Sequence, residues 1–239
     1  MVGRTRNLLL VCLLCAASAG ARADGLTLTT EDYPPFNYDK DGSVVGVSTD
    51  LLRHVLDRAQ VPATFALYPW LRAYGAALND ADTCVYSTTR TPQREPLFKW
   101  VGPLVSNDWV LFVRPDSVAA PKSLSDVKGA VIGGYQGDAV AGYLRDQGLR
   151  LEEVAADRLN PRKLATGRID YWATGRLSGE FVAKLEGVSG LRPVLTIKSV
   201  PLYLACSKTV SDQTVARLNV ALKQLVAEGV AERIFRSYR

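Results

Sequence analysis

From residue 24 onward, short runs of β-forming residues alternate with stretches whose apolar residues recur at helical spacing. Residues 26–29 alternate Leu with Thr, as a strand with two different faces does. Residues 47–59 follow, with Leu51, Leu52, Val55 and Leu56 on one helical face. Repeated along a chain, this alternation is typical of an α/β fold whose strands are largely parallel.

The alternation divides into two series. Strands are expected at 26–29, 64–67, 83–88, 109–113, 131–133, 169–173 and 201–206, and helices at 47–59, 71–78, 139–145 and 212–228. A linker-like segment at 114–121 separates the first series from the second. Gly229 is placed to end the last helix.

The N-terminus has the pattern of a secretory signal. Arg4 and Arg6 precede an apolar run at 8–19, and Ala21-Arg22-Ala23 matches an A-x-A cleavage site. The run is shorter than the ~20 residues that a membrane-spanning helix needs. We therefore expect cleavage after Ala23 and export to the periplasm.

Charge and composition exclude several functions. Without the three arginines of the signal, 26 basic and 24 acidic residues remain, which argues against the concentrated basic face of a nucleic-acid-binding protein. His54 is the only histidine, and no His/Cys cluster has metal-ligand spacing. No G-x-S-x-G motif is present. We expect no metal, no cofactor and no catalytic residue.

Two cysteines lie outside the signal, Cys84 and Cys206, each within a strand-like apolar run. They could pair in an oxidising compartment, or remain as buried free thiols that behave as small apolar residues. The sequence leaves both possibilities open.

The chain resembles the family 3 extracellular solute-binding proteins. The resemblance rests on several segments in a fixed order: 33–36 (YPPF), 41–42 with 46–51, 91–94 (TPQR), 136–137, 167–170 (GRID) and the helical tail 222–235. It implies the two-lobed periplasmic-binding-protein fold (type II, Venus flytrap), with lobe 1 formed by 24–106 and 200–239 and lobe 2 by 107–199. Two hinge strands would join the lobes at 106–108 and 198–200, and a small ligand would be held in the cleft between them.

Arg94 is the strongest candidate for a ligand contact, because a guanidinium matches the two oxygens of a carboxylate. In the family, the arginine at this position clamps the ligand carboxylate. Arg90 could add a second basic contact or form a structural ion pair. Among the hydroxyls before them, strand alternation favours Ser87 and Thr89 over Thr88.

Aromatic residues beside prolines are placed to hold the body of a ligand. Tyr33, Phe36 and Trp70 lie in loops that follow strands, where α/β proteins bind ligands. Any single aromatic could instead belong to the core. Trp109, near the hinge, is expected to pack rather than bind.

Lobe 2 contributes the turn at Gly137, with Asp138 as a helix N-cap or as an acceptor for a ligand amine. In amino-acid-binding members of the family, an aspartate about five residues after Asp170 neutralises the ligand ammonium; here Thr174 and Gly175 stand there. The expected ligand is therefore a carboxylate with a planar or apolar body, preferred over common α-amino acids unless Asp138 or Asp108 supplies the charge.

The function expected from the resemblance is a monomeric, non-enzymatic periplasmic protein that delivers a small carboxylate-bearing ligand to an inner-membrane ABC permease. Two alternatives remain: a ligand-sensing module for a membrane signalling partner, and a dehydratase-like enzyme on the same scaffold.

Overall fold

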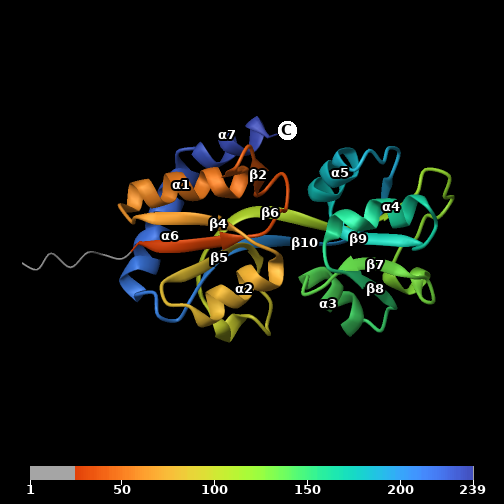
Figure 1. The fold of residues 1–239 in the computed structure, drawn as a ribbon, viewed down its shortest axis with the longest axis horizontal. Coiled ribbons are helices and arrows are strands. Elements are labelled where there is room, and N and C mark those ends of the chain that lie inside the picture. The colour runs from red at the N-terminus through yellow and green to blue at the C-terminus, as the bar shows by residue number, and fades with distance from the viewer. Residues whose placement is uncertain (1–24, 239) are drawn as a thin grey trace, which may run out of the picture.

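The computed structural model describes residues 25–238, and the predicted secretory signal lies outside them. One eight-stranded sheet runs through the whole molecule in the order β4-β1-β5-β10-β6-β9-β7-β8. In lobe 1, which contains β4, β1 and β5, helices α1 and α7 lie on one side of the sheet and α2 on the other (Figure 1). In lobe 2, which contains β9, β7 and β8, α4 and α5 lie on one side and α3 on the other (Figure 1).

The strands are β1 (Leu26–Thr30), β2 (Tyr38–Lys40), β3 (Ser43–Val45), β4 (Ala63–Leu67), β5 (Thr83–Thr89), β6 (Lys99–Val113), β7 (Ile132–Tyr135), β8 (Leu151–Val154), β9 (Tyr171–Gly175) and β10 (Arg192–Cys206). The α-helices are α1 (Val47–Ala59), α2 (Trp70–Asn79), α3 (Ala139–Asp146), α4 (Asn160–Ala165), α5 (Arg176–Leu185), α6 (Asp212–Ala227) and α7 (Val230–Ser237). Short 3₁₀ turns occur at Glu95–Leu97, Leu124–Val127 and Asp157–Leu159.

Two long strands, β6 and β10, belong to both lobes. They pair antiparallel from Cys206 opposite Lys99 in lobe 1 to Arg192 opposite Val113 in lobe 2. Between the lobes, Asn107 lies opposite Val200. The predicted two-lobed α/β fold is thus confirmed, with two strands crossing from one lobe to the other (Figure 1).

The remaining strands are largely parallel, as the alternation predicts: β1 pairs parallel with β4 and β5, and β7 pairs parallel with β8 and β9. The sequence analysis assigned only the last five residues of β6, 109–113, and the last six residues of β10, 201–206. It also missed β8, α4 and α5, and the hairpin formed by β2 and β3. It placed the helices over 47–59 and 139–145 correctly to within one residue.

Each lobe has its own apolar core. In lobe 1, α1 and α6 pack their apolar faces against β1, β5 and β10, with Leu28, Leu52 and Leu218 fully buried. In lobe 2, Leu111, Ile132 and Leu144 form the centre of a second cluster. A smaller cluster joins the lobes, in which Tyr135 of lobe 2 packs with Trp70 and Phe98 of lobe 1. Because the two main cores each lie within one lobe, each lobe can keep its shape as a unit.

A disulfide joins Cys84 in β5 to Cys206 in β10, which face each other across the antiparallel pair. Both sulfur-bearing residues are fully buried. The bond decides the question that the sequence left open. It connects the two parts of lobe 1 that the chain of lobe 2 separates, at a sequence separation of 122.

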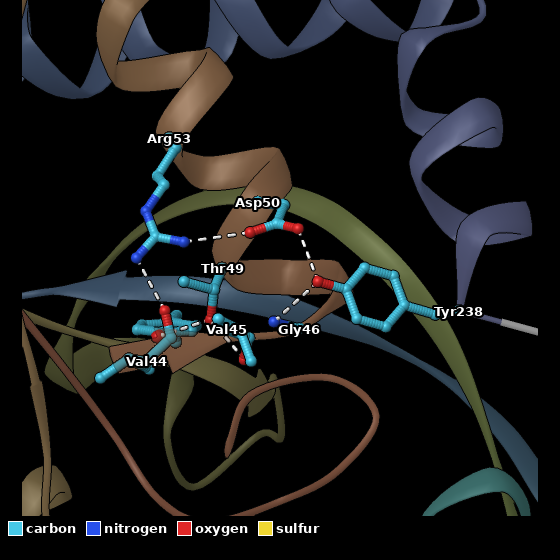
Figure 2. A network of polar contacts seen from close by, with 8 residues as sticks. Val44, Val45, Gly46, Thr49, Asp50, Arg53 and Tyr238 are labelled. Atoms are coloured by element: carbon cyan, nitrogen blue, oxygen red, sulfur yellow. Dashed lines mark hydrogen bonds and ion pairs between the residues drawn. The ribbon is translucent and has the colours of Figure 1, made fainter. Parts of the chain in front are cut away.

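The C-terminal helix is anchored to the start of α1. The hydroxyl of Tyr238 donates to Asp50 Oδ2 (2.6 Å) and accepts from the Gly46 backbone N–H (3.1 Å), as Figure 2 shows. The other carboxylate oxygen of Asp50 accepts from Arg53, whose guanidinium also donates to the Val44 carbonyl. These contacts tie α7 and the β2–β3 hairpin to one end of α1. Among residues 25–238, no helix is long and apolar enough to cross a membrane.

We expect replacement of both Cys84 and Cys206 by alanine to lower the free energy of unfolding by about 4–5 kcal/mol. The reason is that the bond restricts a long loop of the unfolded chain. Urea denaturation of the oxidised protein and the double variant measures the difference, with the wild type reduced under denaturing conditions as the control. An unchanged urea midpoint would show that the bond adds nothing to stability.

Candidate ligand-binding cleft

A cavity lies between the lobes where the loops after β1, β5 and β7 meet β6. Its walls are Glu31, Tyr33, Trp70, Ser87, Thr89, Arg94, Asn107, Trp109, Tyr135, Asp138 and Leu202. Both lobes contribute to this set, and both crossing strands run through it. The space inside that a water-sized sphere can occupy is about 20 Å³, which is room for roughly one water molecule.

The end of β5 places two hydroxyls in the cleft. Ser87 and Thr89 line the cavity, and Thr88 between them points into the fold, where its hydroxyl donates to the Val85 carbonyl. This is the arrangement that strand alternation predicts. The Ser87 hydroxyl also donates to the Asn37 side chain, which fixes its position.

Arg94 reaches across the cleft from lobe 1 to lobe 2. It follows a turn in which the Thr91 hydroxyl accepts from the Arg94 backbone N–H (3.3 Å). Its guanidinium donates to the Thr89 carbonyl (3.2 Å) and to the Gly137 carbonyl of lobe 2 (2.9 Å). It also lies 5.2 Å from the ring centres of both Trp70 and Tyr74, a distance at which a cation is attracted to an aromatic face.

The Gly137 carbonyl oxygen is the point where the donors of lobe 1 converge. Besides Arg94, the indole Nε1 of Trp70 donates to it (2.9 Å). Gly137 has φ +78°, and a Cβ there would lie 2.6 Å from Leu71 and 3.0 Å from Trp70. A glycine is therefore needed for this close approach.

Aromatic hydroxyls make further contacts between the lobes. The Tyr135 hydroxyl, from the end of β7, donates to both carboxylate oxygens of Glu31 at 2.8 Å. The Tyr33 hydroxyl accepts from Asn107 Nδ2 (2.9 Å), which belongs to the crossing strand β6. Burial raises the pKa of Tyr33 and of Tyr135 well above the usual range, so both hydroxyls stay protonated and can donate.

Two partly buried carboxyl groups, Glu31 and Asp138, line the cleft, and a third, Asp157, lines the hollow beside it. Burial raises the pKa of all three, that of Asp138 to about 7, and their mutual repulsion adds to the effect on Glu31 and Asp138. Arg94 lowers the pKa of Glu31 and Asp138 in turn. In the part of the chain that the structure describes, none of the three forms an ion pair with a lysine or arginine.

Gly175 lies directly beside this cleft. A Cβ at this position would lie 2.5 Å from both the Tyr33 hydroxyl and Asn107 Oδ1. The pair formed by Tyr33 and Asn107 thus occupies the space that a side chain at 175 would require. As the sequence analysis expects, no negative charge can come from this position.

The structure brings most of the predicted residues together, but not all. Phe36 is fully buried and packs against Tyr33 rather than facing the cavity. Thr174 is also fully buried and donates to Asp157 Oδ2 (2.8 Å). Arg90 is exposed and forms a two-pronged ion pair with Glu95, which is the structural role that the sequence analysis offered as its alternative.

Several residues of the site or its edge were not singled out from sequence as contacts, namely Glu31, Asn107, Trp109, Tyr135, Asp157 and Leu202. Glu31 and Tyr135 each lie two residues beyond a predicted strand, 26–29 and 131–133, so their positions carried a usable signal. Asn107 lies within a strand that the turn-forming residues around it concealed. Asp157 follows β8, which was not predicted, so nothing local pointed to it.

The described residues 25–238 contain no group of three His, Cys, Asp or Glu side chains arranged to hold a metal ion. The cleft presents one guanidinium, several hydroxyls, aromatic faces and two carboxyl groups, supplied by both lobes, with the carboxyl group of Asp157 beside it. A cleft with these groups is suited chemically to a small, polar, charged ligand.

Residues 26–239 match the bacterial extracellular solute-binding proteins, family 3, and the chain belongs to this family. It is 28% identical over 181 residues to the ABC transporter arginine-binding protein 1 of Escherichia coli K12, covering 69% of each chain. Similar solved structures include a histidine kinase sensor domain with similarity to periplasmic binding proteins (TM-score 0.84, 20% identity, 90% of this chain and 96% of that one). Another is an ancestral arginine-binding protein bound to arginine (TM-score 0.78, 21% identity, 90% and 97%).

The raised pKa of Asp138 predicts that this residue lowers the free energy of unfolding, and that it does so more at high pH than at low pH. Because its pKa in the folded protein is about 7, against about 3.9 in an unfolded chain, the folded state loses stability as the pH rises between these values. Asp138→Asn keeps an oxygen that can accept from the Val140 N–H and removes the charge.

We expect the stability of Asp138→Asn relative to the wild type to increase by about 2 kcal/mol from pH 5 to pH 8. Urea denaturation of both proteins at the two pH values, without added ligand, measures this. Asp170→Asn, in the same lobe, is the control. A difference between wild type and Asp138→Asn that does not change with pH would show that Asp138 is charged throughout.

Proposed function

We propose that this chain is a periplasmic solute-binding protein that encloses an amino-acid-type ligand between its lobes and delivers it to an ABC importer. The observation that carries the proposal is the meeting of Arg94 with Glu31 and Asp138 in one cleft formed by both lobes. Family membership supports the role in solute capture. The name of the Escherichia coli relative, an ABC transporter arginine-binding protein, supports the importer as partner.

The carboxylate of the ligand would bind at Arg94. The Gly137 carbonyl oxygen, which accepts from Arg94 and Trp70, marks the position where these donors can hold an oxygen of a carboxylate. Ser87 and Thr89 line the same cavity and can add hydroxyl bonds. A carboxylate carries the opposite charge and can accept two parallel bonds from the guanidinium fork, so it is a better partner for Arg94 than the single carbonyl oxygen of Gly137.

The cationic group of the ligand would bind at Asp138 and Glu31. An ammonium that is buried without a counter-charge costs several kcal/mol, which was the reason to disfavour α-amino acids when Gly175 was considered alone. Asp138 was the substitute that the sequence analysis left open, and Glu31 lies in the same cavity. With these carboxyl groups in reach, an α-amino acid fits the cleft chemically.

Ligand entry requires the lobes to separate. About 20 Å³ between the walls is far below the roughly 300 Å³ or more of a typical ligand pocket. We propose that a monomer opens by bending β6 near Ser106–Asp108 and β10 near Lys198–Val200, where the two strands pair between the lobes. The predicted signal, cleaved after Ala23, would export the protein to the periplasm.

A sensing role is the second candidate, because one of the similar solved structures is a histidine kinase sensor domain. In that role the same closure would be read by a membrane signalling partner instead of a permease. We do not propose an enzymatic role. The cleft carboxyl groups are placed to face a charged ligand, and the family is one of binding proteins.

Arg94→Ala should lower the affinity for the ligand by 30-fold or more, since truncating a charge-assisted contact in a closed cleft costs about 2–5 kcal/mol. Calorimetry with amino acids that stabilise the wild type in a thermal-shift screen measures the loss. Arg58→Ala is the matched control, because Arg58 forms an ion pair with Glu228 on the outer face of lobe 1. Wild-type affinity in Arg94→Ala would remove the carboxylate clamp and with it the proposal.

A further inference from the structure

Besides the cleft, the two lobes face each other across a cavity on the far side of the hinge strand β6. Its volume is about 400 Å³. Side chains alternate along a strand: Asn107 and Trp109 line the cleft, whereas Ser106 and Asp108 line this cavity and not the cleft. We call it the hinge pocket, and its walls are residues 104–108 of β6, Arg176 and Leu177 of lobe 2, and Ala231, Glu232 and Phe235 of lobe 1.

The hinge strand therefore runs between the cleft and the hinge pocket. When a strand bends, groups on one of its faces separate and groups on the other face approach each other. The proposed opening bends β6 near Ser106–Asp108. Helix α7 of lobe 1 and helix α5 of lobe 2 lie on the same side of the sheet (Figure 1). We expect them to approach each other, and the hinge pocket to narrow, as the cleft opens.

The walls of the hinge pocket carry opposite charges. Arg176, the first residue of α5, donates to the Thr196 hydroxyl (3.0 Å). Within residues 25–238 neither Arg176 nor Asp108 forms an ion pair. Glu232, on α7, pairs with Arg236 one turn along the same helix (2.8 Å), and both side chains are exposed. Such a pair contributes little, so Glu232 is open to a second partner when the pocket narrows.

Farther along α5, an aromatic contact joins the lobes. Phe181 packs against Tyr38 of the β2–β3 hairpin, with ring centres 5.6 Å apart. Ser178 and Val182, on either side of Phe181 in the helix, line the hollow that shares Tyr33 with the cleft. The aromatic contact therefore lies on the cleft side of the hinge, and opening of the lobes would separate its two rings.

The lobe 1 partners of α5 are held by one anchor. Tyr238, directly after α7, bonds to Asp50 and to the Gly46 N–H at the start of α1. Arg53 of α1 donates to the carbonyl of Val44, in the strand that pairs with β2 (Figure 2). Helix α7 and the hairpin thus form one wall of lobe 1, which faces α5.

We propose that this wall and α5 set the balance between the open and closed positions of the lobes. The contact between Tyr38 and Phe181 stabilises the closed position. An ion pair between Arg176 and Glu232, formed when the hinge pocket narrows, stabilises the open position. None of these four residues lines the cleft, so they act on ligand affinity through the position of the lobes. This inference rests on the proposed function and adds the regulation of its opening.

The position of the lobes can be measured without any ligand, from the distance between spin labels at Arg72→Cys and Leu159→Cys. Both positions are exposed. Each is close in sequence to a wall of the hollow beside the cleft, one in each lobe, so opening should lengthen the distance. Because Cys84 and Cys206 are joined in a disulfide, the labels attach to the introduced cysteines.

Arg176→Ala should shift the distances toward shorter values, and Phe181→Ala and Tyr38→Ala toward longer ones, since each removes a contact of one position only. Arg176→Lys should restore the wild-type distribution, because it keeps the charge. Lys184→Ala, an exposed charge on the same helix that lines neither the cleft nor the hinge pocket, is the matched control and should change nothing.

Calorimetry with L-arginine and L-glutamine as probes should show the same order. Arg176→Ala should bind a probe about threefold more tightly than the wild type, and Phe181→Ala about threefold more weakly, as one partly exposed ion pair or one aromatic pair allows. Glu232→Ala should also tighten binding. The double variant of Arg176 and Glu232 should add little to either single variant, because both belong to one pair.

A shift of Arg176→Ala and Phe181→Ala in the same direction would overturn the balance, and so would additive effects of Arg176→Ala and Glu232→Ala. Distances that stay at the wild-type values in all these variants, while a bound probe shortens them, would overturn it as well. Distances that neither the variants nor a bound probe alters would contradict the proposed opening itself. Failure of every amino acid to bind would contradict the proposed function, and the distances would still decide the balance.

Discussion

The pairing of β6 with β10 is the constraint on which the rest of the structure depends. These two strands connect the lobes, and each continues from lobe 1 into lobe 2 within the one eight-stranded sheet. Their shared register brings Asn107 and Trp109 to the centre of the molecule, opposite the strand ends that carry Ser87, Thr89 and Tyr135. A site made from the ends of β1, β5 and β7 and the middle of β6 exists because one pair of strands holds both lobes in a single sheet. The disulfide between Cys84 and Cys206 strengthens the lobe 1 end of the same pair.

Without a bound cation, the ionised carboxyl groups in and beside the cleft destabilise the closed arrangement of the lobes. Burial raises the pKa of Glu31, Asp138 and Asp157, and repulsion from neighbouring carboxyl groups raises the pKa of Glu31 and Asp138 further. Arg94 is the basic side chain that lowers the pKa of both. Sites often retain such unfavourable arrangements because a ligand relieves them. On this account the positive charge of the ligand, as much as its carboxylate, provides the free energy that holds the lobes closed.

Sequence patterns located the helices and strands in which apolar residues recur at a regular spacing. Helix α1 was predicted from its repeating leucines and valines, and the strand end at Ser87 and Thr89 from simple alternation. The patterns failed in the first parts of β6 and β10. In β6, Gly102-Pro103 and Ser106-Asn107-Asp108 resemble turns. In β10, Lys198 and Ser199 are exposed to solvent. Those strands form because they pair with each other, and that information lies about 90 residues apart in the chain. The same reason explains the missed Asp157, which is near the cleft only because β8 and β7 are neighbours. Arg94 and Asp138 were predicted because each lies in a short motif, 91–94 and the turn at Gly137, whose residue types indicate their role.

The central claim, that the cleft recognises a ligand carrying both a carboxylate and a cation, is tested most directly by thermal shift against compounds that differ in charge. The set consists of α-amino acids with acidic, neutral and basic side chains, together with simple amines, aromatic monocarboxylates and dicarboxylates. The account predicts that the largest rise in melting temperature comes from compounds with both groups, above all from basic amino acids, and that dicarboxylates give none. A dicarboxylate or an aromatic acid without an amine as the best stabiliser would contradict it, because either would leave Glu31, Asp138 and Asp157 without a partner.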